Sequence, residues 1–502
     1  MNNSKQIKVG ALLSYFSIAA NIVSGLLYTP WMVETIGKSQ YGLYTLANSV
    51  ITMFLVDFGL SSATGRYLSK YNAEGDREGA ERFLGAIYKL YLLIDAVILC
   101  ALIVVFFLID KIYVNLTPAE LAQFKVVYII SALFSVVNFP FVTLNGILTA
   151  YEKFVPLKIA DLLYRFCNIG FTVLALLLGY GLYALVTVHA VVGLLMLAYK
   201  FIIIKRTIPI KVNFKSTDKG IYREIFGFSI WVTVSSLALR LVFNITPSIL
   251  GIVANSAAIA VFGVVTTIEG YTFTITTAIN GMFMPRISRI VAQGNKEGDL
   301  NRLFIGVGRF QYALNGLIVV GFAVVGRSFI WLWMGEDYIL AYSGILLVLI
   351  PGLFYNGLQI ANTTMVVENK VKWTAMVHVV TGVVNVVLSF FLSSYLGVTG
   401  ACLSIGIAYM VRNVLLHIIY QRELPLDIPH FMKECYGKMS VPIIVTVAVG
   451  FLLNQCIMEA GWGIFLVKAG IIVLVYGISL FFFALDKMER NKARSLLKKR
   501  GK

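Results

Sequence analysis

The sequence predicts an all-α polytopic membrane protein with about 14 transmembrane helices. It predicts two six-helix lobes related by pseudo-two-fold symmetry, followed by two C-terminal helices. Three observations lead to this fold class: the composition, the length of the apolar blocks and an internal repeat. Of the 502 residues, 59% are hydrophobic and 13% are charged. This charged fraction is about half that of a soluble protein.

The apolar residues are gathered in blocks, most of them long enough to cross a bilayer. About 20 helical residues span the ~30 Å hydrocarbon core. A chain in lipid must satisfy its own backbone hydrogen bonds, so each block is expected to be helical. The predicted spans are 9–33, 42–64, 84–109, 124–149, 155–178, 182–204, 225–250, 257–283, 303–326, 339–366, 373–395, 398–420, 440–457 and 463–485.

Basic residues are distributed unequally between alternate loops. One set of loops, which includes both termini, holds 32 Lys and Arg residues, and the other set holds 4. Membrane proteins collect Lys and Arg on the cytoplasmic side, so both termini are predicted to be cytoplasmic. The same rule accounts for the formal net charge of +17 without a nucleic-acid partner. The five cysteines have neither metal-binding nor redox spacing, and no metal or cofactor is expected.

Short matches recur at an offset of 217 to 219 residues in equivalent spans. Spans one to six and seven to twelve therefore look like two parallel copies of a six-helix unit. The predicted domains are an N-lobe (1–204), a basic cytoplasmic linker (205–224), a C-lobe (225–420) and a C-terminal region (421–502) with two more helices and a basic tail. The matches are Gly75–Gly79 with Gly294–Gly298, Thr29-Pro30 with Thr246-Pro247, Asn168 with Asn385, and Ala184 with Ala401.

The segment from Tyr28-Thr29-Pro30 through Ile36–Tyr44 resembles the opening of polysaccharide transporters. These form the O-antigen-flippase-like family of the multidrug/oligosaccharidyl-lipid/polysaccharide exporter superfamily. Asn145–Phe154 is similar to the end of the family's fourth helix, and Val383–Ala401 to its eleventh and twelfth helices. The resemblance covers almost the whole chain, including its 6 + 6 + 2 layout, and its motifs are mostly structural.

The resemblance implies a flippase with a MATE-like fold in the bacterial cytoplasmic (inner) membrane. Its substrate would be an undecaprenyl-diphosphate-linked oligosaccharide, moved from the cytoplasmic to the outer leaflet by alternating access during polysaccharide biosynthesis. Membrane lipids, a polysaccharide polymerase and glycosyltransferases are the partners it implies. No family motif fixes a ligand residue, so the candidate residues below come from physical arguments.

Charged residues inside predicted spans need a reason, because each costs ~2.5–3.5 kcal/mol at the membrane centre. Arg240 and Glu269 lie near the centres of spans seven and eight. Either they neutralise each other and hold two helices together, or Arg240 faces the cavity and attracts a diphosphate while Glu269 carries protons. Asp57 and Asp95 are further candidates for ion coupling.

Four other basic residues are candidates for diphosphate binding: Lys89, Arg165, Arg309 and Arg412. Lys89 is near enough to the cytoplasmic end of its span to snorkel. Arg165 stands four residues after Asp161 and is expected to pair with it. Arg309 and Arg412 either snorkel or line an inward-open cavity. Lys468, near the outer end of the last span, is expected to snorkel.

Uncharged polar residues and prolines inside the spans complete the predictions. Asn21 and Asn244 lie near corresponding positions of the two copies and are candidate polar residues of the cavity. Pro30 and Pro247, also equivalent, are expected to bend their helices. His189 is expected to be a buried histidine with a hydrogen-bond partner.

The sequence shows no paired catalytic carboxylates on a soluble domain and no phosphate-binding glycine loop, so an enzyme is not expected. Three other functions are alternatives to the flippase. A multidrug exporter of the same superfamily would need a more acidic or aromatic cavity. A peptidoglycan-precursor flippase is chemically close. A membrane-embedded glycosyltransferase would need a longer catalytic loop than residues 205–224.

Overall fold

The computed structural model describes residues 3–214, 219–293, 297–457, 461–485 and 490. Its elements in the first half are α1 (Asn3–Ile36), α2 (Lys38–Phe54), α3 (Leu60–Glu74), α4 (Arg77–Ile112), α5 (Pro118–Asn138), the 3₁₀ turn η1 (Phe139–Val142), α6 (Thr143–Ala150), α7 (Phe154–Leu177), α8 (Gly181–Thr207), α9 (Lys219–Phe243) and α10 (Ile245–Val253). The second copy of the glycine-flanked loop (294–298) and the basic tail lie largely outside the described residues.

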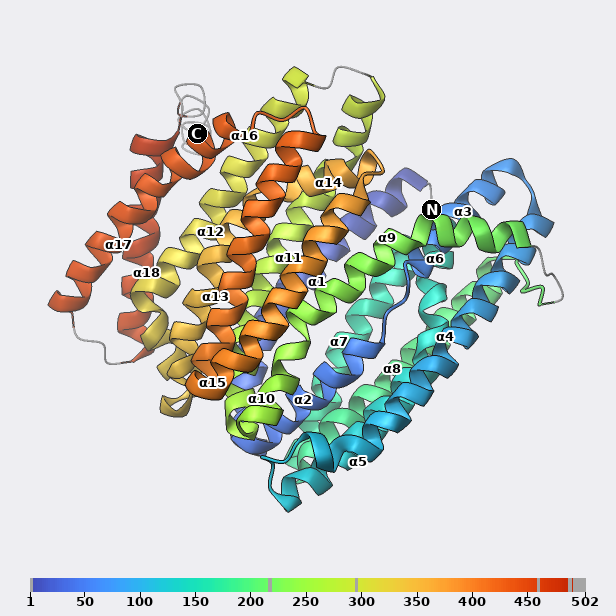
Figure 1. The fold of residues 1–502 in the computed structure, drawn as a ribbon, viewed down its shortest axis with the longest axis horizontal. Coiled ribbons are helices and arrows are strands. Elements are labelled where there is room, and N and C mark those ends of the chain that lie inside the picture. Colours follow the sequence, from blue (N-terminus) through green and yellow to red (C-terminus); the bar gives the residue numbers. More distant parts are fainter. Residues whose placement is uncertain (1–2, 215–218, 294–296, 458–460, 486–489, 491–502) are drawn as a thin grey trace. The chain divides into compact units, whose positions relative to one another are not determined.

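In the second half, too, every element of the described residues is a helix (Figure 1). It comprises α11 (Ser256–Ala292), α12 (Glu297–Met334), η2 (Glu336–Tyr338), α13 (Leu340–Gly357), α14 (Gln359–Val367), α15 (Val371–Glu423), α16 (Ile428–Phe431), the π-helical η3 (Met432–Gly437), α17 (Lys438–Cys456), α18 (Trp462–Ser479) and the π-helical η4 (Leu480–Ala484). The predicted all-α membrane fold is confirmed.

Local signals in the sequence set several helix ends. A capping box starts α5, where the Thr117 hydroxyl accepts from the Glu120 backbone and the Glu120 carboxylate accepts from the Thr117 backbone. Asp76 caps α4 by accepting from Gly79. Gly75 ends α3 at a φ of 70°, a left-handed conformation that glycine adopts without a steric penalty.

Within the described residues, twelve helical segments are long and apolar enough to cross a membrane, against the fourteen spans predicted. Two features account for the difference. Helix α15 has 53 residues, about 80 Å of helix, and contains two predicted spans joined at a kink at Gly397, where φ is 55° and ψ is −129°. The predicted span 42–64 is divided between α2 and α3, so neither part reaches spanning length.

The chain forms two compact units. Residues 1–263 and 386–397 make up the first, and residues 264–385 and 398–502 the second. In the first unit α7 packs on α1 and α8, α5 packs on α2 and α8, and α3 packs on α6. In the second, α12 packs on α13, α17 and α18. The sequence-based domain boundaries differ from this division and stay a prediction.

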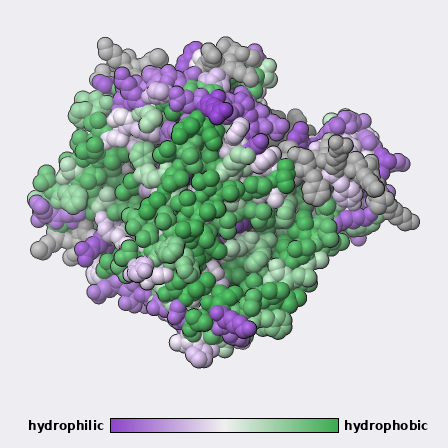
Figure 2. Space-filling model, viewed as in Figure 1, coloured by the Kyte–Doolittle hydropathy of each residue, from purple (hydrophilic) through white to green (hydrophobic). Residues whose placement is uncertain are grey.

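The outer faces of the long helices are apolar. Leu27, Phe107 and Leu177 are 73%, 72% and 71% exposed. On the face seen in Figure 2, hydrophobic side chains cover the middle of the helices and hydrophilic ones gather toward their ends. Exposed apolar surface of this extent is expected of helices that contact lipid.

Candidate functional site

The second predicted span is broken in its middle. Helix α2 ends at Phe54 and α3 begins at Leu60. Between them Phe58 and Gly59 have φ values of 54° and 69°, and a non-glycine residue in that region is rare. Irregular backbone at membrane depth leaves polar groups unpaired, so it is tolerated where protein buries it or where it lines a cavity.

Asp57 and Arg240 form hydrogen bonds with backbone groups at opposite ends of this break. Asp57 Oδ1 accepts from the Gly59 backbone N–H at 3.0 Å and its Oδ2 from that of Ser61 at 3.4 Å, at the N-terminus of α3. Arg240 Nη2, from α9, donates to the Leu55 carbonyl at 3.4 Å, just beyond the C-terminus of α2. The helix dipoles favour this placement of an anion at an N-terminus and a cation at a C-terminus.

The break opens onto a cavity of about 260 Å³ in the first unit, which we call the arginine cavity. The Arg240 guanidinium and the Asp57 carboxylate share it and attract each other electrostatically. A guanidinium presents a fork of donors that matches a phosphate group. Its lining residues are Leu55, Asp57, Ser135, Asn138, Phe139, Val142 and Arg240.

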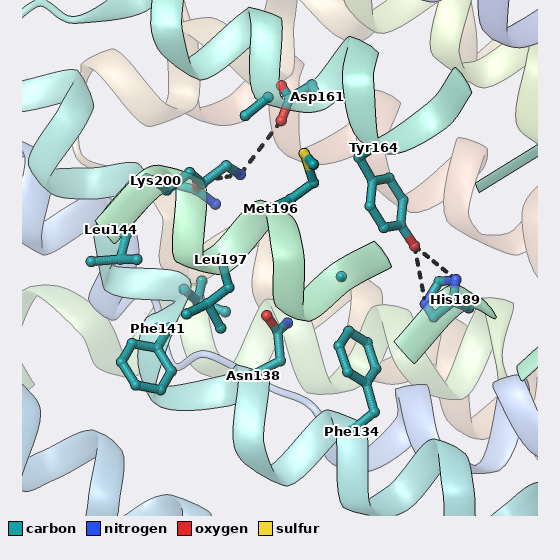
Figure 3. Close-up of a pocket in the computed structure, with 14 residues that line it drawn as sticks. Phe134, Asn138, Phe141, Leu144, Asp161, Tyr164, His189, Met196, Leu197 and Lys200 are labelled. Atoms are coloured by element: carbon teal, nitrogen blue, oxygen red, sulfur yellow. Dashed lines mark hydrogen bonds and ion pairs between the residues drawn. The ribbon is translucent and has the colours of Figure 1, made fainter. Parts of the chain in front are cut away.

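A second cavity, of about 290 Å³, lies among α5, α6, α7 and α8 (Figure 3). We call it the α7–α8 cavity. A third, of about 200 Å³, is lined by residues that include Tyr44 and Asn48 of α2. Asn138, the last residue of α5, lines all three cavities. The three therefore adjoin one another around the end of α5.

Two polar pairs lie at opposite sides of the α7–α8 cavity, as Figure 3 shows. The Tyr164 hydroxyl lies 2.7 Å from His189 Nδ1, so His189 has the partner that was expected for it. Lys200 Nζ lies 3.6 Å from Asp161 Oδ1 and donates to Asn145 Oδ1 at 3.0 Å. Asp161 is also paired with Lys158 at 3.2 Å.

Arg165 extends away from this cavity toward α1. Its Nη2 donates to the Asn21 carbonyl at 2.9 Å and its Nε to the Ser24 hydroxyl at 3.3 Å. Asp161, its expected partner, is held by Lys158 and Lys200. Asn21 thus contributes a backbone carbonyl to the contact between α1 and α7.

Asn244 lies at a break between α9 and α10, three residues before Pro247. Its carbonyl accepts a hydrogen bond from the Ser49 hydroxyl of α2. The equivalent Pro30 stays within a continuous α1. The two copies therefore differ at this point, because only the second has its helix interrupted there.

Lys89 and Asp95 are both half-buried on α4. Asp95 Oδ1 is buried and has no hydrogen-bond partner within the described part of the chain. A buried carboxylate oxygen without a donor is costly, so Asp95 stays a candidate for ion coupling.

In the second unit, Glu269 of α11 accepts a hydrogen bond from the Tyr409 hydroxyl of α15. The Arg412 guanidinium lies over two rings, 3.8 Å from the Tyr355 centroid and 4.1 Å from that of Tyr409. Arg412 is 2% exposed and attracts Glu269 electrostatically. The described contacts therefore give Glu269 a network of its own, separate from the contacts of Arg240.

Arg309 joins α12 to the C-terminal helices. Its Nη2 donates to the Ala484 carbonyl at 2.6 Å, and its Nη1 lies 3.7 Å from the Glu434 carboxylate. Lys468 is 1% exposed and donates to Asn454 at 3.0 Å. The expectation that Lys468 snorkels is wrong, because a neighbouring amide on α17 satisfies its ammonium group inside the protein.

Sequence reasoning missed Asn138, Asn145, Tyr164 and Lys200 as cavity residues. A signal for them was present on α8, where His189, Gly193, Met196 and Lys200 recur at helical spacing and share one face. Tyr164 likewise follows Asp161 by three residues. In the described ranges, no group of three or more His, Cys, Asp or Glu residues is arranged to hold a metal ion.

The amino-acid sequence is similar to one protein family and to several known membrane proteins. A family model described as "Polysaccharide biosynthesis protein" matches residues 10–291. The membrane protein EpsK of Bacillus subtilis, described as uncharacterized, is 22% identical over 514 residues, which cover 94% of this chain and 96% of that protein. A candidate O-antigen transporter of Shigella flexneri is 25% identical over 202 residues, 40% of this chain and 47% of that protein.

The fold is similar to those of solved transporters. The lipid II flippase MurJ in an inward closed conformation matches with a TM-score of 0.72 and 15% identity, over 94% of this chain and 97% of that one. An inward-facing multidrug resistance transporter of the MATE family, in the MOP superfamily, matches with a TM-score of 0.67 and 13% identity, over 84% of this chain and 99% of that one. At such identities the likeness shows the fold.

Proposed function

Because the chain belongs to the family of polysaccharide biosynthesis proteins, we propose that it is a flippase for undecaprenyl-diphosphate-linked oligosaccharide. The family and the fold make it a multi-pass membrane transporter of the MOP-superfamily type. The proposal adds three points to this. It names the substrate, it assigns movement from the cytoplasmic to the outer leaflet of the bacterial inner membrane, and it assigns alternating access as the mechanism.

The observation that carries the proposal is the arginine cavity. Arg240 is a cation inside a membrane span, and it lines a space of about 260 Å³ at a broken helix. Intramembrane basic residues that line cavities mark anion pathways. A diphosphate is the anionic part of the proposed substrate, and the guanidinium offers it paired donors. The polyprenyl chain would stay in lipid.

Asp57 gives the cavity a second function in this proposal. Its carboxylate lines the same space as Arg240 and attracts the guanidinium, so it would compete with a phosphate for that group. Binding of a proton or sodium ion at Asp57 would free Arg240 for the diphosphate. Ion coupling is therefore assigned first to Asp57, with Asp95 and Glu269 as the further candidates. Arg165, Arg309, Arg412 and Lys89 stay predictions as diphosphate ligands.

The rival substrates differ in charge and headgroup. A cationic drug would meet Arg240 in the cavity, which disfavours a multidrug exporter. A peptidoglycan precursor carries the same diphosphate, so the arginine cavity fits it equally well. Purified protein in liposomes, offered labelled undecaprenyl-diphosphate oligosaccharide or labelled peptidoglycan precursor in turn, separates these two.

The test is flipping by proteoliposomes, measured as loss of label accessible to a membrane-impermeant reagent. Removal of a charged hydrogen-bond partner costs ~1.5–3 kcal/mol, so Arg240→Ala should slow flipping about tenfold or more. Arg240→Lys should retain part of the rate because it keeps the charge. Arg327→Ala, at an exposed arginine of α12, is the matched control. Unchanged flipping by a folded Arg240→Ala protein would show that Arg240 is structural.

A further inference from the structure

We propose that the α7–α8 cavity binds a sugar ring of the substrate, the one attached to the diphosphate. This inference rests on the proposed function and goes beyond it by assigning the carbohydrate to a subsite separate from the arginine cavity. The subsite lies within the first unit, among α5 to α8. Four observations carry the inference: the charge of the lining, its aromatic rings, its amides and its position.

The charges of this cavity cancel, which favours a neutral ligand. Its lining contains one carboxylate, Asp161, and one ammonium, Lys200, paired at 3.6 Å. Lys158 adds a second partner for Asp161 at 3.2 Å. A cationic drug would have to displace two lysines, and an anion would have to displace Asp161. A ligand with hydroxyl groups can hydrogen-bond to the pair without separating it, because a hydroxyl both donates and accepts.

Aromatic rings supply the apolar part of the lining. Phe134, Phe141, Tyr164 and His189 border the space, as Figure 3 shows. The ring faces carry partial negative charge, and the C–H face of a pyranose is weakly positive, so the two surfaces are complementary. A site with apolar walls and a few fixed polar groups is typical of small-molecule binding.

Amide groups in the lining can form hydrogen bonds that distinguish sugars by the positions of their hydroxyl groups. The Asn138 side chain points from α5 toward the interior in Figure 3, and no hydrogen bond to it is found among the described residues. Asn145 uses its Oδ1 to accept from Lys200, which leaves its amide hydrogens for a ligand. An amide offers both donors and an acceptor, so these two residues can engage adjacent hydroxyls.

Size and position limit the ligand to the first sugar. At about 290 Å³ the cavity lies just below the ~300–1,000 Å³ range of drug-sized small-molecule sites, which suits one ring and excludes a whole oligosaccharide. Asn138 and Val142 also line the arginine cavity. A diphosphate at Arg240 would therefore have its attached sugar next to this space.

The experiment compares binding of a carrier with and without one sugar. Native mass spectrometry of the purified full-length protein in detergent would measure affinity for undecaprenyl diphosphate alone. It would also measure affinity for a panel of the same carrier bearing one hexose, one N-acetylhexosamine or one deoxyhexose. Two or three new hydrogen bonds should make at least one glycosylated carrier bind about tenfold tighter than the bare carrier.

Variants locate the sugar. Asn138→Ala removes an amide, and Tyr164→Phe removes a hydroxyl that can both donate to and accept from a sugar. Each should reduce that preference several-fold, and Tyr164→Phe should leave affinity for the bare carrier unchanged. The matched control is Tyr183→Phe, at a half-exposed tyrosine of α8 outside the cavity lining, which should keep the preference. Thermal unfolding of each variant in detergent verifies that it is folded.

Three results would overturn the inference, and they are distinguishable. If no carrier binds the wild-type protein, the proposed function itself fails. If the bare carrier binds as tightly as every glycosylated one, the diphosphate site stands and the sugar subsite does not exist. If the preference survives unchanged in both folded variants, the sugar is bound elsewhere in the protein.

Discussion

Ser39 and Ser256, 217 residues apart, have hydroxyl oxygens 3.1 Å apart. Both contact one carboxylate, because Ser39 Oγ donates to Glu120 Oε1 at 2.6 Å and Ser256 Oγ hydrogen-bonds to the same oxygen. Their separation equals the offset that relates Thr29 to Thr246 in the repeat. Equivalent positions of the two copies thus meet at one acidic residue of α5.

The backbones also approach closely at this point. A Cβ atom at Gly42 would lie 2.0 Å from the Ser256 carbonyl oxygen, so only glycine fits there. We expect Gly42→Ala to prevent this contact. Thermal unfolding of the purified protein in detergent should show a lower Tm than for Gly170→Ala, the same substitution at a helical glycine of α7 with no atom within 4 Å of its Cβ position.

The serine pair predicts non-additive stability. Ser39→Ala and Ser256→Ala each leave the Oε1 atom of Glu120 one hydroxyl partner, so each should cost about 0.5–1.5 kcal/mol. The double variant removes both, and its loss should exceed the sum of the single losses. Thermal unfolding of the four proteins measures this. Ser343→Ala, at an exposed serine of α13, is the control, and strict additivity would contradict a shared acceptor.

Substitutions at Asp57 should separate its role as a hydrogen-bond acceptor at the start of α3 from its role as a negative charge. Asparagine keeps one acceptor oxygen for the two backbone N–H groups that Asp57 binds, and alanine keeps none. Asp57→Asn should therefore lose less stability than Asp57→Ala, with each lost hydrogen bond costing about 0.5–1.5 kcal/mol. If the carboxylate couples transport to an ion, both variants should flip substrate at a rate that no longer responds to an imposed gradient. A gradient response retained in Asp57→Asn would assign coupling to another residue.

The network around Arg412 predicts different effects for two tyrosines. Tyr409→Phe keeps the ring under the guanidinium but removes the hydroxyl that donates to Glu269. Loss of a hydrogen bond to a charged group should cost ~1.5–3 kcal/mol. Tyr355→Phe keeps the other stacked ring and should be near neutral. Comparable destabilisation of both variants would mean that the hydrogen bond from Tyr409 to Glu269 contributes no more to stability than the hydroxyl of Tyr355 does.

The kink in α15 depends on its glycine. Gly397 has a φ of 55° and a ψ of −129°, with no atom within 4 Å of a Cβ built on it. Gly397→Ala should therefore destabilise the protein through backbone strain alone, by about 1–3 kcal/mol. Gly470→Ala, at a helical glycine with equally open surroundings, should be neutral or stabilising. Equal melting temperatures for the two variants would argue against strain at the kink.

By itself, the sequence determined that the chain is helical and lies in a membrane. Long apolar blocks in lipid must form helices, and their pattern along the chain locates them. Their number was not determined in this way, because the structure joins two predicted spans in α15 and divides another between α2 and α3. The repeat predicted two related halves, and their boundaries stay a prediction. These properties depend on residues close together in the chain, so a linear pattern is enough to specify them.

Only the tertiary structure decided which polar residues share a space. Arg240 meets the broken end of α2, 185 residues away, and Lys468 finds Asn454 where snorkelling was expected. Helix rotation and breaks such as that at Leu55 to Gly59 are set by packing between distant segments. A hydrophobic span tolerates a polar group on any buried face, so its sequence does not determine which way a polar side chain points. The cavities around Asn138 therefore became visible only in three dimensions.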